Sequence, residues 1–136
     1  MNNYRTPLRD IDFTLFELFK YEQHCRAIGH VSLDRELTGA FLGEAARFAE
    51  EVLAPLGSVG DQQGCKLIDG KVITPPGFKQ AYQQYCEAGW PTLSRSTAFG
   101  GQGLPQSLGV ILSEIIGTPN WAWGMYAGLS QGAMHT

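Results

Sequence analysis

Apolar residues recur at helical spacing along most of this chain. The clearest helix is predicted over residues 33–54. Its apolar stripe consists of Leu33, Leu37, Phe41, Phe48 and Val52. Ser32 is expected to cap this helix, and Pro55 is expected to end it because proline lacks the N–H group that a helix interior needs. Gly39 and Gly43 fall on one face, where a second backbone has room to approach closely.

Four further helices are predicted on either side of a Gly- and Pro-rich connection over residues 56–76. They are expected at residues 10–28 with Asp10 as the N-cap, at 76–88, at 104–116 with Pro105 in the first turn, and at 119–132 with Thr118 as the cap. Within the connection, Asp69-Gly70 separates two short apolar pieces and indicates a hairpin over residues 66–74. The fold class is therefore predicted to be all-α, with about five helices.

The fifth predicted helix is apolar on nearly every side. Its large apolar residues are Trp121, Trp123, Met125, Tyr126 and Leu129. A helix of this kind is normally buried on most of its surface. The partners for those faces are not evident within the chain, so the sequence predicts a helical domain that is incomplete at its C-terminal end.

Composition excludes several classes of function. Charged residues make up 17% of the 136 residues, below the usual quarter, which hints that part of the surface is normally covered. The net charge is −3 with no basic run, so a nucleic-acid-binding function is not expected. No apolar run approaches the roughly 20 residues that a membrane span requires, and the first ten residues do not resemble a signal peptide. A cytoplasmic protein is the expectation.

The cysteine and histidine spacing does not favour a metal site. Cys25, Cys65 and Cys86 are widely spaced and form no C-x-x-C pair, so three reduced thiols are expected rather than a zinc or redox centre. His24 and Cys25 are adjacent on a predicted helix and point about 100° apart, so they cannot share a metal ion.

Two glycine-containing motifs suggest chemistry but have simpler explanations. Residues 128–132 match the G-x-S-x-G elbow of hydrolases, which places serine on a turn between a strand and a helix. Here a helical pattern precedes Ser130, and only His135 follows, so small residues on a packed helix explain the match better. Residues 100–103 resemble a phosphate-binding loop, but no strand precedes them and the fingerprint is incomplete. A turn between two helices is the favoured interpretation.

An ordered series of short motifs resembles the acyl-CoA dehydrogenase family. The stretch from Tyr4 to Phe13 resembles the extension that opens the longer members of that family. The later motifs are Ala54-Pro55-Leu56, Gly60-Asp61, Pro76-Gly77-Phe78, Ala81-Tyr82, Gly89-Trp90, Gly100 to Pro105, and Glu114. Each motif is weak by itself, whereas their order and gaps are specific. The turn at residues 95–99 departs from the family pattern because it lacks the acidic residue and tyrosine often found there.

The resemblance implies an N-terminal extension over residues 1–31 with one short helix, followed by an incomplete helical domain over residues 32–136. It also implies a parent enzyme that uses FAD to desaturate an acyl-CoA substrate at the α,β bond. The family's flavin contacts and catalytic glutamate come from regions further along, so no catalytic or cofactor-binding residue is carried over, and the chain alone is expected to be inactive.

The resemblance does place one wall of an acyl pocket on this chain. The expected wall residues are Trp123, Ala127 and Leu129, with Tyr126 as a weaker candidate. The large Trp123 would shorten the pocket and favour a short or aromatic acyl group. Homo-oligomers formed through exposed apolar helix faces are also expected. The alternative is a stand-alone, non-catalytic binding module that contacts a partner through residues 121–129.

Overall fold

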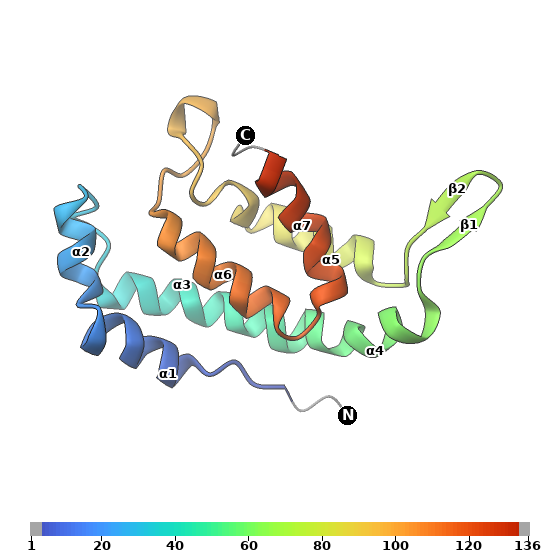
Figure 1. The fold of residues 1–136 in the computed structure, drawn as a ribbon, viewed down its shortest axis with the longest axis horizontal. Helices are drawn as coiled ribbons and strands as arrows, with labels where there is room; N and C mark the ends of the chain where they lie inside the picture. Colours follow the sequence, from blue (N-terminus) through green and yellow to red (C-terminus); the bar gives the residue numbers. More distant parts are fainter. Residues whose placement is uncertain (1–3, 134–136) are drawn as a thin grey trace.

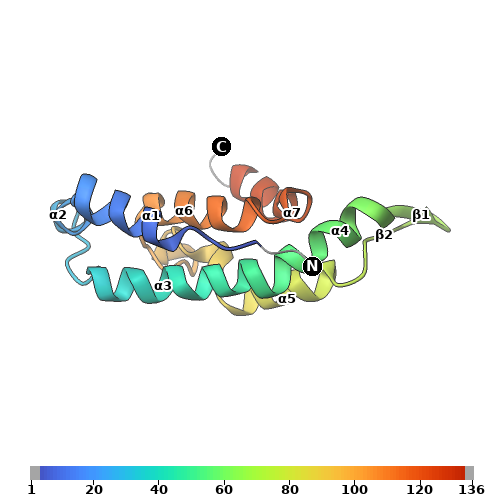
Figure 2. The same ribbon diagram turned by 90° about the horizontal axis from the view of Figure 1, so that it is seen from below.

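The computed structural model describes residues 4–133, which form two layers of helices (Figures 1 and 2). One layer contains α3 (Arg35–Phe48) and α5 (Phe78–Glu87), and the other contains α1 (Leu8–Asp12), α6 (Gln106–Gly117) and α7 (Trp121–Ala133). α2 (Tyr21–Ala27) lies at one end, and α4 (Ala54–Gln63) leads to a small hairpin at the other. The helical class is confirmed.

The helix that Pro55 was expected to end continues for another two turns. α3 runs through a π-helical segment, η2 (Ala49–Leu53), directly into α4, which contains Pro55 in its first turn. The backbone N–H of Ala54 donates to the carbonyl of Ala49, five residues back rather than four. A π turn is wider than an α turn and makes room for the proline ring that would otherwise break the helix. The prediction that residues 56–63 form a connection is therefore wrong.

Two predicted helix caps are replaced by neighbouring residues. Asp34, not Ser32, caps α3, and its Oδ1 accepts the N–H of Leu37 at 2.8 Å. Asn120, not Thr118, caps α7, and its Oδ1 accepts the N–H of Trp123 at 3.1 Å. Asn120 is buried, and its Nδ2 also donates to the Leu53 carbonyl at 3.2 Å. This cap therefore also fixes α7 against the long helix, the continuous helix formed by α3, η2 and α4. The Thr118 hydroxyl instead donates to the carbonyl of Glu114 at 2.7 Å.

The first predicted helix is divided in two. It begins at Leu8 rather than at Asp10, and it continues as a π-helical segment, η1 (Phe13–Leu18). Lys20 then takes a left-handed conformation with φ of 51°, which reverses the chain before α2. Asp10 lies within the first turn and does not cap the helix.

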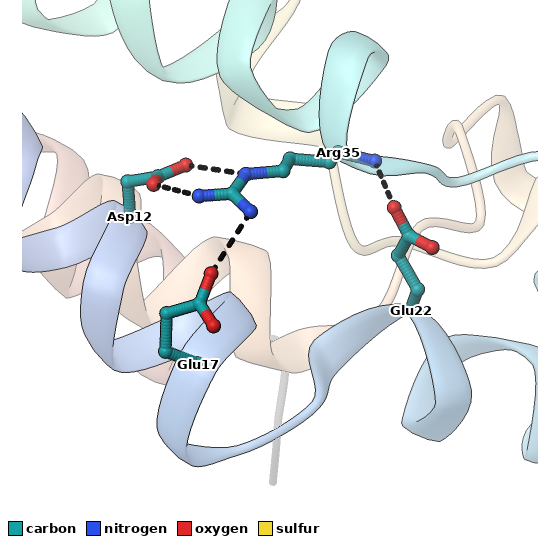
Figure 3. A network of polar contacts seen from close by, with 4 residues as sticks. All are labelled: Asp12, Glu17, Glu22 and Arg35. Carbon is teal, nitrogen blue, oxygen red and sulfur yellow. Dashed lines mark hydrogen bonds and ion pairs between the residues drawn. The ribbon is translucent and has the colours of Figure 1, made fainter.

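Arg35 connects the N-terminal segment to the start of α3 (Figure 3). Its guanidinium donates to both carboxylate oxygens of Asp12 and, at 3.0 Å, to Glu17, while its backbone N–H donates to Glu22 at 2.8 Å. The hydrogen bonds to Asp12, followed by those to Glu17, raise the pKa of Arg35. The guanidinium also lies 5.0 Å from the centre of the Phe16 ring, a cation–π contact. One arginine thus holds three acidic side chains from two helical segments.

The hydrophobic core is continuous from the N-terminal segment to α7. Buried residues of one cluster come from the N-terminal segment (Leu15, Phe16, Tyr21, Cys25), from the long helix, and from α5, α6 and α7. No backbone within residues 4–133 approaches Gly39 or Gly43 closely, because a Cβ at either position would have no neighbour within 4 Å there. Within residues 4–133, no helix is both long and apolar enough to cross a membrane.

The predicted hairpin is confirmed. β1 (Lys66–Ile68) and β2 (Lys71–Ile73) pair antiparallel, with Leu67 opposite Val72. The two turn residues, Asp69 and Gly70, have φ angles of 49° and 74°, as a type I′ turn requires. All six strand residues are exposed, and the hairpin projects from the helical body (Figure 1).

Candidate functional site

The predicted pocket-wall residues all lie on α7, but they face different surroundings. Trp123 is fully buried. Its Nε1 donates to the Phe78 carbonyl at 3.1 Å, and its ring packs edge-on against Phe48 and Tyr85 with centroids 5.9 and 5.6 Å away. Trp123 therefore supports α7 from within the core. Its ring lines neither the trench nor the groove described below, so the structure gives no support to the expectation that Trp123 shortens an acyl pocket.

Ala127 and Leu129 border a narrow trench between α6 and α7. The trench has a volume of about 160 Å³. It is lined by Tyr85, Ser113, Ile116, Gly117, Trp121, Gly124, Met125, Ala127, Gly128, Leu129 and Gln131. This volume is well below the usual few hundred Å³ of a ligand pocket, so the trench by itself is too small to enclose an ordinary ligand.

Glycines shape this trench, and they were missed as site residues. A Cβ at Gly124 would lie 3.5 Å from the Cα of Gly117, so two glycines meet where α6 and α7 come closest. A Cβ at Gly128 would have no neighbour within 4 Å and would project into open space. Within residues 4–133, the small residues at 128 and 132 are therefore not packed against another helix. Their four-residue spacing, repeated from Gly124, was the signal that α7 has one face without side chains.

The outer edge of the trench on α7 is apolar and exposed. Trp121, Met125 and Leu129 recur every four residues, and the side chains of Trp121 and Leu129 are 72% and 67% exposed. The sequence showed no evident partner for the apolar faces of this helix, and residues 4–133 leave this face uncovered. An exposed apolar stripe of this kind usually marks a surface that another molecule or segment covers.

Tyr126 faces a different groove from Ala127 and Leu129. This groove lies between the hairpin, α5 and α7 and has a volume of about 390 Å³. It is lined by Val72, Thr74, Phe78, Lys79, Tyr82 and Tyr126. The Tyr126 ring packs edge-on against Phe78 at 6.2 Å, and its hydroxyl lies 3.5 Å from the Cys65 thiol. The hydrogen bond to Cys65, followed by partial burial, raises the pKa of Tyr126.

A larger groove contains none of the predicted wall residues. It has a volume of about 730 Å³ and separates the N-terminal segment from α6. Tyr21 and Ser107 share a hydrogen bond of 2.8 Å on its wall, and the carboxylates of Asp10 and Glu114 border it. Burial raises the pKa of Tyr21 to about 12.

Neither glycine-containing motif has the geometry of its catalytic counterpart. Ser130 lies inside α7, not on a strand-to-helix turn, so the helical interpretation is confirmed; His135 lies outside the described residues. In the loop at residues 100–103, the N–H groups of Gly101, Gln102 and Gly103 donate to carbonyls of residues 92–96. These amides are therefore not free to bind a phosphate group, and the loop is a structural turn.

The polar side chains between residues 4 and 133 also gather no set of three or more His, Cys, Asp or Glu that could hold a metal ion. Cys25 is buried in the core, and burial raises the pKa of its thiol, which makes it a poor nucleophile.

Burial of Tyr85 predicts a loss of stability at high pH. Burial, followed by the effect of Cys86, raises the pKa of Tyr85 from 10.0 to about 12. Because the folded state favours the neutral phenol, this contribution to stability is present below pH 10 and is lost as the pH rises to about 12. Urea unfolding across that range should show a falling midpoint, and the fall should be smaller in Tyr85→Phe. An equal fall in both proteins would assign the effect to other groups, Tyr21 among them.

Comparison with known proteins identifies close relatives over nearly the whole chain. The chain is 34% identical to 3-methylmercaptopropionyl-CoA dehydrogenase of Ruegeria pomeroyi over 131 residues, which cover 96% of this chain and 22% of that enzyme. It is 33% identical to the broad-specificity linear acyl-CoA dehydrogenase FadE5 of Mycobacterium tuberculosis, covering 94% of this chain and 21% of that enzyme.

A third relative agrees with the first two. The chain is 34% identical to butyryl-CoA dehydrogenase of Syntrophomonas wolfei over 108 residues, which cover 72% of this chain and 17% of that enzyme. The chain thus spans about a fifth of the length of the curated relatives that it matches. No protein-family model matches it.

Proposed function

The chain belongs to the acyl-CoA dehydrogenase family, and we propose that it forms the amino-terminal helical part of an enzyme that desaturates an acyl-CoA thioester at the α,β bond. The observation that carries this proposal is the match over 96% of the chain to one such enzyme. The helical fold agrees with it, because most of the matched motifs lie on helices or in the segments next to them.

The chemistry of this reaction is assigned to polypeptide outside these 136 residues. Desaturation needs a base for the α-proton and an acceptor for the β-hydride, which in the parent enzyme is FAD. The glycine-rich loop at residues 100–103 offers no flavin-phosphate site, because its amides are already hydrogen-bonded to the chain itself. The proposal therefore derives no flavin step from this chain, which on this account contributes shape and packing.

The contribution proposed for this chain is one wall of the acyl site, on α7. The trench beside Gly128 is apolar and narrow, and Ala127 and Leu129 border it. An extended acyl chain could lie along a helix face that lacks side chains, while another part of the enzyme closes the opposite side. Trp123 would act indirectly by holding α7 in place. Tyr126 faces the other groove and is the weakest of the four candidates.

The second candidate function is a stand-alone, non-catalytic binding module. The exposed stripe of Trp121, Met125 and Leu129 favours it, because such a surface suits a partner protein as well as a missing part of an enzyme. A module that functions alone is expected to be monodisperse and to unfold cooperatively. A part of a larger enzyme is expected to self-associate through this stripe, which is also the basis for the homo-oligomer proposed here. A cytoplasmic location is proposed with either function.

The proposed division of labour predicts that the isolated chain neither binds flavin nor oxidises a substrate. The purified chain would be mixed with excess FAD, separated by gel filtration, and assayed with butyryl-CoA and an electron-accepting dye. We expect no flavin absorbance in the protein fraction and no dye reduction above the background of free FAD. A flavin-containing fraction that reduces the dye only with substrate would contradict the assignment of the chemistry to other regions.

A further inference from the structure

The lysines of this acidic chain are concentrated in the hairpin and the start of α5, and one of them, Lys79, lines a groove. The net charge is −3, yet three of the four lysines, Lys66, Lys71 and Lys79, lie within residues 66–79. The ion pairs formed within residues 4–133 all use arginines, so none of these three lysines is paired with a carboxylate there. Their positive charge is thus uncompensated by short-range partners, although Asp69 lies at the hairpin turn.

The hairpin presents two different faces. Side chains of directly paired residues lie on the same face of a sheet, so Leu67 and Val72 form an apolar face. The other face carries Lys66, Ile68, Lys71 and Ile73. Val72 lines the groove of about 390 Å³, which places the apolar face on the groove side. Since an isolated two-stranded hairpin is only marginally stable in water, a ligand held against this face would also stabilise the hairpin.

The groove combines an apolar interior with a single positive charge. Phe78, Tyr82 and Tyr126 supply aromatic walls from α5 and α7, and Lys79 is the only charged residue that lines it. Its volume lies within the usual range for small-molecule sites, and it shares no lining residue with the α7 trench. A ligand matched to this groove has an apolar body and one negatively charged end.

We propose that the groove between the hairpin, α5 and α7 binds a soluble, single-chain amphiphilic anion, with its carboxylate or phosphate at Lys79 and its chain between Val72 and the aromatic rings of Phe78, Tyr82 and Tyr126. The site goes beyond the acyl wall proposed on α7, because it shares no lining residue with the trench there and needs no flavin chemistry; of the four wall candidates only Tyr126, the weakest, lines it. The ammonium group of Lys79 favours ligands with a negative charge over those with a positive charge, and the aromatic walls favour an apolar chain of modest length.

Titration of the full 136-residue chain with decanoate tests this site by calorimetry. We expect saturable binding by the wild type and a dissociation constant raised roughly tenfold or more in Lys79→Glu, which replaces an attractive contact with a repulsive one. Lys20→Glu, at the only lysine outside the cluster, is the matched control and should bind as the wild type does. Thermal unfolding followed by circular dichroism confirms that each variant is folded.

Several results would overturn the proposal. The first is an absence of saturable decanoate binding by the wild type. The second is an equal rise in the dissociation constant for decanoate in Lys79→Glu and Lys20→Glu. The third is binding of decyltrimethylammonium to the wild type as tight as that of decanoate. Sedimentation with phosphatidylglycerol vesicles in the absence of decanoate binding would also overturn it and would assign the basic hairpin to a membrane surface. None of these measurements depends on dehydrogenase activity, so a failure here is distinguishable from a failure of the proposed enzyme function.

Discussion

Trp123→Ala is expected to lower the free energy of unfolding of this chain by about 3–5 kcal/mol, the range typical of large-to-small changes at buried aromatic residues. The Trp123 ring is fully buried between the long helix and α5, and its indole N–H bonds to the Phe78 carbonyl. Alanine would leave a cavity beside Phe48 and Tyr85 and a buried carbonyl without its donor. Urea unfolding followed by circular dichroism measures the change.

Trp121→Ala is the matched control for this substitution. It removes the same side chain from the same helix two residues earlier, where the ring is 72% exposed. We expect a change of less than about 1 kcal/mol, because little area is removed from water at this position. Similar losses in the two variants would show that α7 does not pack through Trp123, and the arrangement of helices described above would be wrong.

Gly128→Phe is expected to impair the oxidation of long acyl-CoA substrates when the chain is part of a complete enzyme. A side chain at this position enters the open part of the α7 trench, where no other atom lies within 4 Å. The variant can be made in a chimera in which this chain replaces the matching 131 residues of the Ruegeria pomeroyi relative. Since blocking even part of an apolar pocket costs about 10–200-fold in kcat/KM, we expect a loss of that order for long substrates and a smaller loss for short ones.

Gly43→Phe is the control for the acyl-chain experiment. Gly43 is also a helical glycine without a neighbour within 4 Å of a Cβ, but it lies on α3 rather than on α7. This variant should keep the substrate preference of the unmodified chimera. An unchanged preference in Gly128→Phe, with flavin bound and protein folded, would remove the trench from the acyl site.

The sequence predicted the helical class and most helices because their apolar stripes extend over several turns. The positions where helices end and the residues that cap them were harder to predict, because neighbouring residues compete for the same role. A proline inside a helix usually ends it. At Pro55 the helix continues because a π turn precedes the proline, as the hydrogen bond from the Ala54 N–H to the Ala49 carbonyl shows. Asn120 caps α7 in place of Thr118 because its side chain also reaches Leu53, a contact that is 67 residues distant in sequence.

The candidate site was predicted less well than the fold. Apolar periodicity identified α7 correctly but could not tell which of its faces is buried, because its large apolar residues fall on more than one face. Trp123 was therefore expected at a pocket wall, although it lies in the core, while Gly128, which borders the trench, was attributed to packing and Gly124 was not considered. Lys66, Lys71 and Lys79 lie within the 14 residues 66–79, but they are not consecutive and so form no basic run in the sequence.

The assignment of this chain to a working acyl-CoA dehydrogenase is tested most directly by the unmodified chimera with the Ruegeria pomeroyi relative. Its flavin content and its rate of acyl-CoA-dependent dye reduction would be measured beside those of the parent enzyme. If this chain is the amino-terminal helical part of such an enzyme, the chimera should bind flavin and oxidise acyl-CoA. A folded chimera with a full complement of flavin but no acyl-CoA oxidation would contradict that assignment and favour the stand-alone binding module.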